Sequence, residues 1–370
     1  MDDVRKITVE ALDVLLVELA GRGYVLVGPT VSEGVVVLDR ISSVADLARG
    51  VVDGQGPGEY RLRDSGGIRL FDATCGPESA KRFLFPPRET LATVRRDQQT
   101  LSVEEAPIEA RPVAILGLRS CDLHAIRTQD AVFLGGRPDR RYRARRDAAF
   151  LIGVDCARAG STCFCASMGT GPACTTGFDV ALTELDSGDL LVRAGTAAGE
   201  EMLAVLPAQD ALPDDVAEAA AAEARTAGSM GRDVCTEGLR DLLYRNLEHP
   251  RWSKVAEQCL ACGNCTAVCP TCFCHDVVDS ASLSGDVAER SREWASCFSL
   301  EFSHLAGHDV RASRDARYRQ WVTHKFAGWV DQFGTSGCVG CGRCITWCPV
   351  GIDITAELAA IRDADGEVAQ

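Results

Sequence analysis

The sequence predicts an α+β protein: an N-terminal α/β domain over residues 1–230 is followed by a helical domain over residues 231–370. Two observations support this fold class. In the first part, short apolar runs typical of buried strands alternate with segments of helical periodicity. After an Ala- and Glu-rich helical stretch at 214–228, helical segments dominate, so we place the boundary near residues 225–235.

The N-terminal domain is expected to contain an open sheet. Its first elements are a helix over 7–20, strands over 24–29 and 34–41, and a Gly-rich loop over 50–66. Two further apolar runs, 112–118 and 150–155, end close to Cys121 and Cys156 respectively. Because ligands of open α/β sheets commonly bind at the carboxyl ends of the strands, we expect a site at this edge.

Composition limits the classes of partner. The formal net charge of −14 argues against nucleic acid or an anionic membrane surface as a partner. No apolar run reaches the roughly 18 residues that a membrane-spanning helix requires, so membrane insertion is not expected. Asp2, Asp3 and Glu10 interrupt any pattern of a secretory signal near Met1. We therefore expect a cytoplasmic protein.

Cysteine is the most informative residue type, with 18 copies in the chain. Thiols stay reduced in the cytosol, so a disulfide framework is not expected. Binding of a metal or an iron–sulfur cluster is the leading explanation for so many cysteines in such a protein. Some of them must nevertheless be ordinary buried residues.

Eight cysteines form two copies of the pattern C-x2-C-x2-C-x3-C-P, which is the signature of bacterial 4Fe–4S ferredoxins. In two-cluster ferredoxins the fourth cysteine of each motif binds the cluster of the other motif. The expected ligands are Cys259, Cys262, Cys265 and Cys348 for the first cluster, and Cys338, Cys341, Cys344 and Cys269 for the second.

Zinc is the alternative for paired CxxC sequences, but zinc sites do not require a third cysteine and a Cys-Pro pair in both copies. The 68 residues between Cys269 and Cys338 are too many for a compact bacterial ferredoxin. We therefore expect a helical two-cluster ferredoxin domain, in which inserted helices cover the clusters.

The other ten cysteines fall into three groups. The first group, which follows predicted strands, could hold a third 4Fe–4S cluster, a zinc ion or plain redox-active thiols, and it comprises Cys121, Cys156, Cys163 and Cys165. The second is expected to pack around a cluster and comprises Cys272, Cys274 and Cys297. Cys75, Cys174 and Cys235 are expected to be ordinary.

Two other features have weaker functional interpretations. The run of arginines within 137–146 is either a solvated face or a docking surface for an acidic partner or an anionic cofactor. The Gly-rich segment 167–172 is either a tight turn or a loop that approaches a phosphate. We identify no set of residues that forms a catalytic centre.

Most of the chain beyond about residue 80 resembles one family: the iron–sulfur beta subunit of cytoplasmic nickel–iron sulfhydrogenases, together with the related iron–sulfur subunit of anaerobic sulfite reductase. The resemblance lies in LGLRSCDLHAI at 116–126, CFCASMGTGP at 163–172, CLACGNCTAVCPTCFC at 259–274, SCFSLEFSHLAGHDVRASRDARYRQWVTHKF at 296–326 and GCVGCGRCITWCPVGIDIT at 337–355. Cys121, Cys156, Cys163 and Cys165 match cysteine positions of that family.

The resemblance implies an electron-transfer subunit without a substrate site of its own. Its expected partners are a flavin and NAD(P)-binding subunit, together with either the hydrogenase small and large subunits or a sulfite-reducing subunit. The sequence does not distinguish the hydrogenase from the sulfite reductase. A free-standing iron–sulfur redox sensor is the alternative of another class, although the acidic chain contains no basic helix that would bind nucleic acid.

Overall fold

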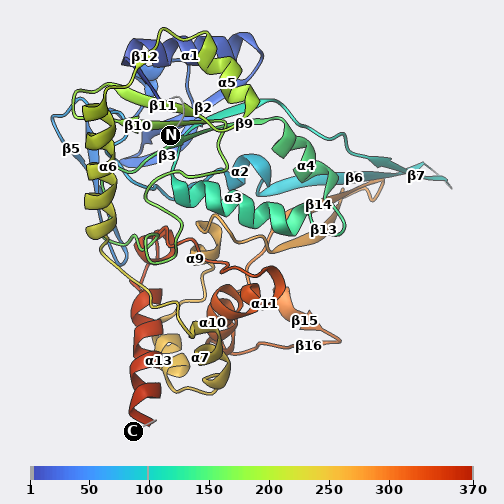
Figure 1. Ribbon diagram of the computed structural model, residues 1–370. Helices are drawn as coiled ribbons and strands as arrows, with labels where there is room; N and C mark the ends of the chain where they lie inside the picture. The colour runs from blue at the N-terminus through green and yellow to red at the C-terminus, as the bar shows by residue number, and fades with distance from the viewer. Residues whose placement is uncertain (1–3, 98–99, 369–370) are drawn as a thin grey trace.

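Eight strands form the main sheet of the protein (Figure 1), for which the computed structural model describes residues 4–97 and 100–368. The three central pairs, β10 with β9, β9 with β8 and β8 with β2, are parallel, and the outer pairs are antiparallel. In spatial order the strands are β12 (Gln209–Asp210), β1 (Arg5–Ile7), β11 (Leu190–Ala194), β10 (Val180–Glu184), β9 (Ala149–Val154), β8 (Val113–Leu118), β2 (Val25–Ser32) and β3 (Val35–Arg40).

Helices cover both faces of this sheet. One face packs against α1 (Val9–Gly21) and α5 (Ala197–Ala204), and the other against α3 (Ser120–Phe133) and α4 (Arg140–Asp147). Successive side chains of a strand point to opposite faces of the sheet, so each strand contributes to both layers. Ile152 of β9 packs in the α1 layer, whereas the adjacent Leu151 packs in the α3 layer.

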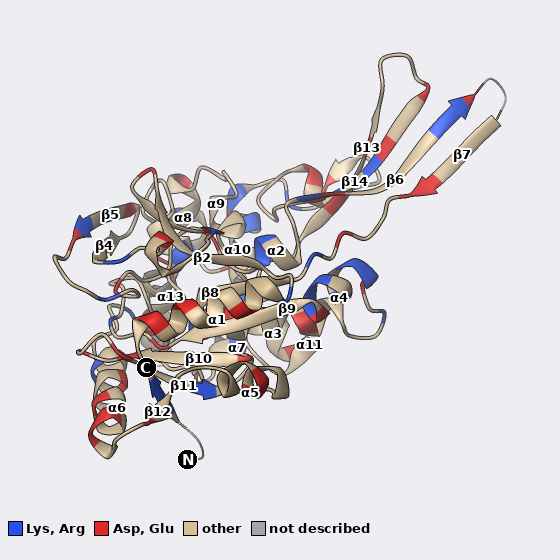
Figure 2. Ribbon diagram, turned by 90° about the horizontal axis from the view of Figure 1, so that it is seen from above, with Lys and Arg blue, Asp and Glu red and all other residues tan. Residues whose placement is uncertain are grey.

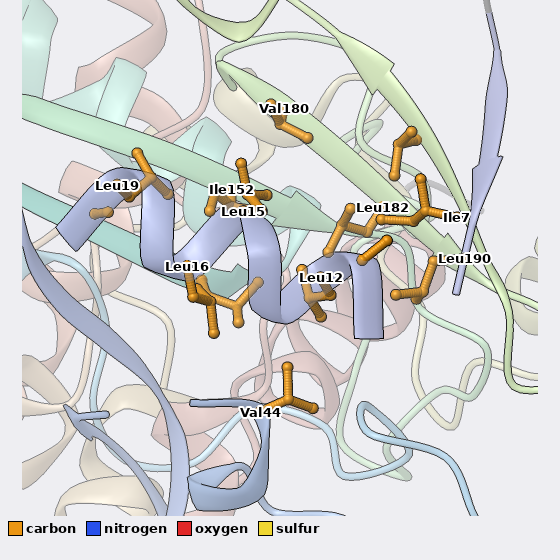
Figure 3. Close-up of a cluster of buried hydrophobic side chains, with 14 of the residues drawn as sticks. Ile7, Leu12, Leu15, Leu16, Leu19, Val44, Ile152, Val180, Leu182 and Leu190 are labelled. Atoms are coloured by element: carbon orange, nitrogen blue, oxygen red, sulfur yellow. The ribbon is translucent and has the colours of Figure 1, made fainter. Parts of the chain in front are cut away.

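Helix α1 supplies much of the core on its side of the sheet. Its N-cap residue, Thr8, accepts a hydrogen bond from the Ala11 N–H, and its leucines recur at helical spacing. Figure 3 shows Leu12, Leu15, Leu16 and Leu19 on the face of α1 that meets the strands.

Helices with aromatic side chains surround the two cysteine motifs in the C-terminal part. Trp252, Tyr318, Trp321 and Phe326 are buried together there. The longer helical segments are α7 (Leu239–Arg245), α8 (Arg251–Gln258), α10 (Arg314–Thr323), a π-helical turn (His324–Gly328), α11 (Trp329–Phe333) and α13 (Ile354–Val368). Two one-turn helices, α9 (Asn264–Ala267) and α12 (Arg343–Thr346), lie within the motifs.

A second, four-stranded sheet joins the two parts of the chain. Its order is β13 (His275–Ala281), β14 (Val287–Trp294), β6 (Arg88–Asp97) and β7 (Thr100–Glu105), all antiparallel. We call this sheet the arm, because Figure 2 shows it projecting from the body of the protein. Other elements are the 16-residue helix α6 (Pro213–Gly228) and the shorter α2 (Lys81–Leu84), β4 (Val51–Gly56), β5 (Glu59–Asp64), β15 (His304–Leu305) and β16 (His308–Asp309).

The structure corrects two predictions of local structure. The Gly-rich segment 50–66 is not a loop but the hairpin of β4 and β5. The insertion between the cysteine motifs is helical over 314–333, as predicted, but 275–294 forms β13 and β14 instead. The physical reason is the pairing of β14 with β6, a strand almost 200 residues earlier in the chain, which local periodicity does not reveal.

The arginine run at 137–146 anchors the base of the arm. Glu89 of β6 is buried and bonded by Arg141, Arg145 and Arg292. Although burial alone would raise the pKa of Glu89, the guanidinium groups of Arg145 and Arg292 hold that pKa below its ordinary value. Arg140 pairs with Glu105 and Arg146 pairs with Asp130, so four arginines of the run have carboxylate partners within the chain.

Truncation in the α1 layer tests this description of the core. Leu15 is 0% exposed, so we expect Leu15→Ala to lower the free energy of unfolding by about 2–5 kcal/mol through lost burial and a cavity. The measurement is equilibrium urea unfolding followed by circular dichroism. Val17 on the same helix is 67% exposed, and Val17→Ala should change stability by less than about 1 kcal/mol. Equal effects of the two variants would contradict the assigned orientation of α1.

Candidate metal centres

The four cysteines predicted for the first centre line one cavity. Cys259 ends α8, Cys262 and Cys265 flank the start of α9, and Cys348 follows α12 in the second motif. The backbone turns sharply at Gly263, whose φ of 74° lies in the left-handed region that glycine adopts readily. Cys344 of the second motif also lines this cavity, so the structure brings thiols of both motifs together here.

The walls of this cavity are largely apolar. Phe298, Tyr318, Trp321 and Ile354 line it together with the thiols. Burial raises the pKa of Cys259 and raises that of Cys265 well above its ordinary value. A cationic centre would compensate for this burial, because metal binding stabilises the deprotonated thiolate. An all-thiol donor set in an apolar pocket therefore fits an iron–sulfur cluster.

The four thiols predicted for the second centre also lie near one another. Burial raises the pKa of Cys338 to about 11 and that of Cys341 to about 12, and the charge of Cys269 adds to both shifts. The pKa of Cys344 is likewise raised by burial and by its neighbours Cys338, Cys341 and Cys269. This grouping unites Cys269 from the first motif with three thiols from the second.

A buried lysine contacts one thiol of the second group. Lys325 is 5% exposed, and its Nζ lies 3.2 Å from Cys269 Sγ and 3.1 Å from Thr271 Oγ1. The pKa of Cys269 is held well below its ordinary value, first by a hydrogen bond with Cys272, and further by the charge of Lys325. Lys325 belongs to the family-like segment 296–326, but it lies 56 residues from Cys269 along the chain, so only the fold shows that the two side chains meet.

The N-terminal cysteines gather in a third group. Cys121 lies in the first turn of α3 rather than in a loop, Cys156 follows β9, and Cys163 and Cys165 lie in the loop before β10. Burial raises the pKa of Cys163 well above its ordinary value, and the charges of neighbouring thiols, including Cys165 and Cys156, add to the shift. Cys121 and Cys165 lie in one buried cluster, and the charge effects place Cys156 and Cys163 near Cys165.

Cys75, which we expected to be ordinary, belongs to this third group. Its Sγ lies 3.8 Å from Cys121 Sγ, and both sulfurs and a carboxylate oxygen of Asp122 lie within 4.8 Å of one another. A negative charge on Cys75 also raises the pKa of Cys156, Cys163 and Cys165. The segment around Cys75 has no motif and no periodicity, so only tertiary structure places it here.

The third group packs directly against the second cysteine motif. The Phe164 N–H donates to the Gly340 carbonyl at 2.8 Å, and Thr170 Oγ1 donates to the Val339 carbonyl at 2.7 Å. Contact is so close that a Cβ at Gly340 would lie 2.6 Å from the Phe164 carbonyl oxygen. The Cys-Phe-Cys loop and the second motif are therefore held together as one unit.

A buried arginine lies between the second and third groups. Arg343, from the second motif, pairs with Asp122 at 2.9 Å and donates to the Gly76 carbonyl at 2.9 Å. Burial raises the pKa of Cys341, and the charge of Arg343 opposes that shift. The hydrogen bond with Cys121 lowers the pKa of Cys75, and the charge of Arg343 lowers it further. Because a guanidinium does not lose its proton in proteins, Arg343 is a permanent positive charge between the two sets of thiols.

The other cysteines have simpler surroundings. Cys272 and Cys274 follow Cys269 and lie near the charges of Lys325 and Lys81, and Cys297 packs beside the aromatic core, so all three lie around the cysteine motifs. Cys174 is buried near the Leu118 carbonyl, and Cys235 is exposed.

Residues 167–170 of the Gly-rich segment line a cleft of about 700 Å³. Arg127 and Cys338 lie on its walls.

Comparison with known proteins agrees with the cysteine motifs. Residues 258–352 match the family described as 4Fe-4S dicluster domain. The chain is 36% identical over 288 residues to sulfhydrogenase 2 subunit beta of Pyrococcus furiosus, an alignment that covers 76% of this chain and 82% of that relative. No solved structure matches the chain significantly.

Among the described residues, each helix is too short or too polar to cross a membrane. The match to the dicluster family and the extent of the similarity confirm the predicted 4Fe–4S domain and the resemblance on which the electron-transfer role was based. The chain belongs to the family of sulfhydrogenase beta subunits and is an iron–sulfur electron-transfer subunit.

Proposed function

We propose that this chain relays single electrons within a multisubunit oxidoreductase, between a flavin and NAD(P)-binding partner and a nickel–iron hydrogenase module. The main support is the contiguous set of three thiol groups, which runs from the first motif through the second to the Cys-Phe-Cys loop. The similarity to a sulfhydrogenase subunit favours the hydrogenase assembly. The equivalent iron–sulfur subunit of an anaerobic sulfite reductase is the second candidate.

The proposed ligands follow the grouping of the thiols. Cys259, Cys262, Cys265 and Cys348 would hold the first cluster. Cys338, Cys341, Cys344 and Cys269 would hold the second. A third would be held by Cys121, Cys156, Cys163 and Cys165, with Cys75 beside them. When bound, such clusters accept and release one electron at a time.

The chain's own residues would set the environment of these centres. Phe298, Tyr318 and Trp321 keep water from the first cavity. Lys325 and Arg343 place buried positive charges beside the thiols of the second and third groups. Positive charge favours the more negative, reduced form of a redox centre, so both residues would raise reduction potentials.

Isolation of the intact assembly tests the proposed function. A tagged chain purified without oxygen from its source cells should bring with it a flavoprotein and hydrogenase subunits, and the assembly should reduce NAD(P) with hydrogen. The chain by itself should turn over neither hydrogen nor sulfite. Copurification with a sirohaem subunit, and sulfite-dependent oxidation of NAD(P)H, would instead identify the sulfite reductase assembly.

Iron and acid-labile sulfide counts test the third centre. The wild-type chain should contain about twelve of each, whereas Cys163→Ser should contain about eight, because one cluster is lost. Cys235→Ser is the matched control, since Cys235 is exposed and belongs to none of the three groups, and it should retain about twelve. A count near eight that Cys163→Ser leaves unchanged would rule out the third cluster.

Replacement of Lys325 tests the electrostatic role of this residue. Lys325→Met removes a buried positive charge 3.2 Å from Cys269 Sγ, so the reduction potential of the second centre should become more negative. The measurement is a redox titration followed by electron paramagnetic resonance. Lys254→Met is the control, because Lys254 is exposed and solvent screens its charge. An unchanged set of potentials in Lys325→Met would contradict this role.

A further inference from the structure

Two side chains in the wall of the first cavity carry buried hydrogen-bond donors. Tyr318 is 2% exposed and Trp321 is 4% exposed, and both line the cavity beside the thiols of the first centre. Among the described residues, neither the Tyr318 hydroxyl nor the Trp321 Nε1–H has a hydrogen-bond partner. Buried donors are normally paired, because a donor that loses water without gaining an acceptor costs free energy. These two donors therefore require an acceptor in or beside the cavity.

Helix α10 carries both donors on one face. Tyr318 and Trp321 are three residues apart, so their side chains are neighbours, and their ring centroids lie 5.6 Å apart. Phe298 packs edge-to-face against both rings, with centroid distances of 6.3 Å to Tyr318 and 5.8 Å to Trp321. The helix is also tied to a predicted cluster ligand, because the Arg314 guanidinium donates to the Cys259 carbonyl at 2.8 Å. Packing therefore fixes the two rings relative to the thiols.

Sulfur is the acceptor that this cavity offers. Apart from Tyr318 and Trp321 themselves, its described lining side chains are cysteines and apolar groups, so no carboxylate, amide or other hydroxyl group lines it. Burial raises the pKa of Tyr318 well above its ordinary value, and negative charge on Glu357 and on the nearby thiols, first among them Cys265, raises it further. The phenol therefore stays protonated near the sulfurs, and an indole N–H can only donate.

Reduction of an iron–sulfur centre adds negative charge that its sulfur atoms share. A donor aimed at sulfur is attracted more strongly to this reduced form than to the oxidised form. Hydrogen bonds to the sulfurs are accordingly among the features that set the potential of a cluster. Uncharged donors exert this effect without burying a charge, in contrast with Lys325 in the second group.

We propose that Tyr318 and Trp321 donate hydrogen bonds to sulfur atoms of the first centre and so raise its reduction potential. This inference rests on the proposed function, which places a 4Fe–4S cluster in the first cavity. The aromatic wall would then tune the centre as well as exclude water from it.

Packing alone does not account for a tyrosine at this position. Phe298 in the same wall shows that an aromatic ring without a polar group fits these surroundings. Phenylalanine at position 318 would supply the same ring without burying a hydroxyl group, so a wall that only filled space would be better built without the donor.

Removal of each donor from the cluster-containing chain tests this proposal. Tyr318→Phe removes only the hydroxyl, and replacement of Trp321 by benzothienylalanine removes the N–H but keeps the bicyclic ring. In each variant we expect the ratio of reduced to oxidised first centre at a fixed potential to fall about three- to ten-fold, the effect of one net hydrogen bond. The measurement is a redox titration followed by electron paramagnetic resonance, in which the first centre gives the signal that Cys262→Ser alters.

Tyr244→Phe is the matched control. It also removes a phenol hydroxyl, but that hydroxyl bonds Asp331 on the surface, and Tyr244 does not line the first cavity. The potential of the first centre should therefore equal that of the wild type. Iron and acid-labile sulfide contents should also equal those of the wild type in this control and in both donor variants.

A stronger donor should shift the potential in the opposite direction. A ring-fluorinated tyrosine at position 318 keeps the ring and the hydroxyl but has a more acidic phenol, which donates a stronger hydrogen bond. The potential of the first centre should then rise above that of the wild type. A residue that only fills space would leave the potential unchanged, so this measurement separates hydrogen bonding from packing.

Unchanged potentials in both donor variants, with full iron content, would overturn the proposal for Tyr318 and Trp321 alone. A shift of equal size in Tyr244→Phe would overturn it as well. A wild-type chain without any cluster signal that Cys262→Ser alters would instead overturn the cluster assignment in the proposed function on which this inference rests.

Discussion

The contact between the Cys-Phe-Cys loop and the second cysteine motif determines how the two parts of the protein work together. The hydrogen bond from the Phe164 N–H to the Gly340 carbonyl requires the two backbones to lie almost in contact. Only glycine permits this approach, because a Cβ at position 340 would collide with the Phe164 carbonyl group. As a result, thiols from the α/β part and thiols from the second motif become neighbours.

Buried positive charge is the second constraint on this region. Many thiols in a water-excluding environment would repel one another if they were ionised, and burial by itself keeps them protonated. Lys325 beside Cys269 and Arg343 beside Cys341 oppose both effects. Each cation is also tied to the structure by uncharged or acidic groups, Thr271 for Lys325 and Asp122 for Arg343. Their positions are therefore defined by packing as well as by attraction to the thiols.

The arm is likewise assembled from segments that are far apart in the chain. Its central strands, β6 and β14, come from distant parts of the chain, and Glu89 fixes them to α4 through buried arginines. The arginine run, which in the sequence suggested a surface patch, is used internally to neutralise this carboxylate.

The sequence by itself determined the eight motif cysteines, their expected crossed grouping and the principal strands and helices of the α/β part, because these depend on spacing and local periodicity. It also identified the cysteines at 121, 156, 163 and 165 as a set. Only the tertiary structure added Cys75 and Lys325, since each reaches the thiols from a distant segment, and it alone showed that Arg343 of the second motif pairs with Asp122 beside Cys121. It alone decided that residues 275–294 are strands, because their pairing with β6 overrides local preference.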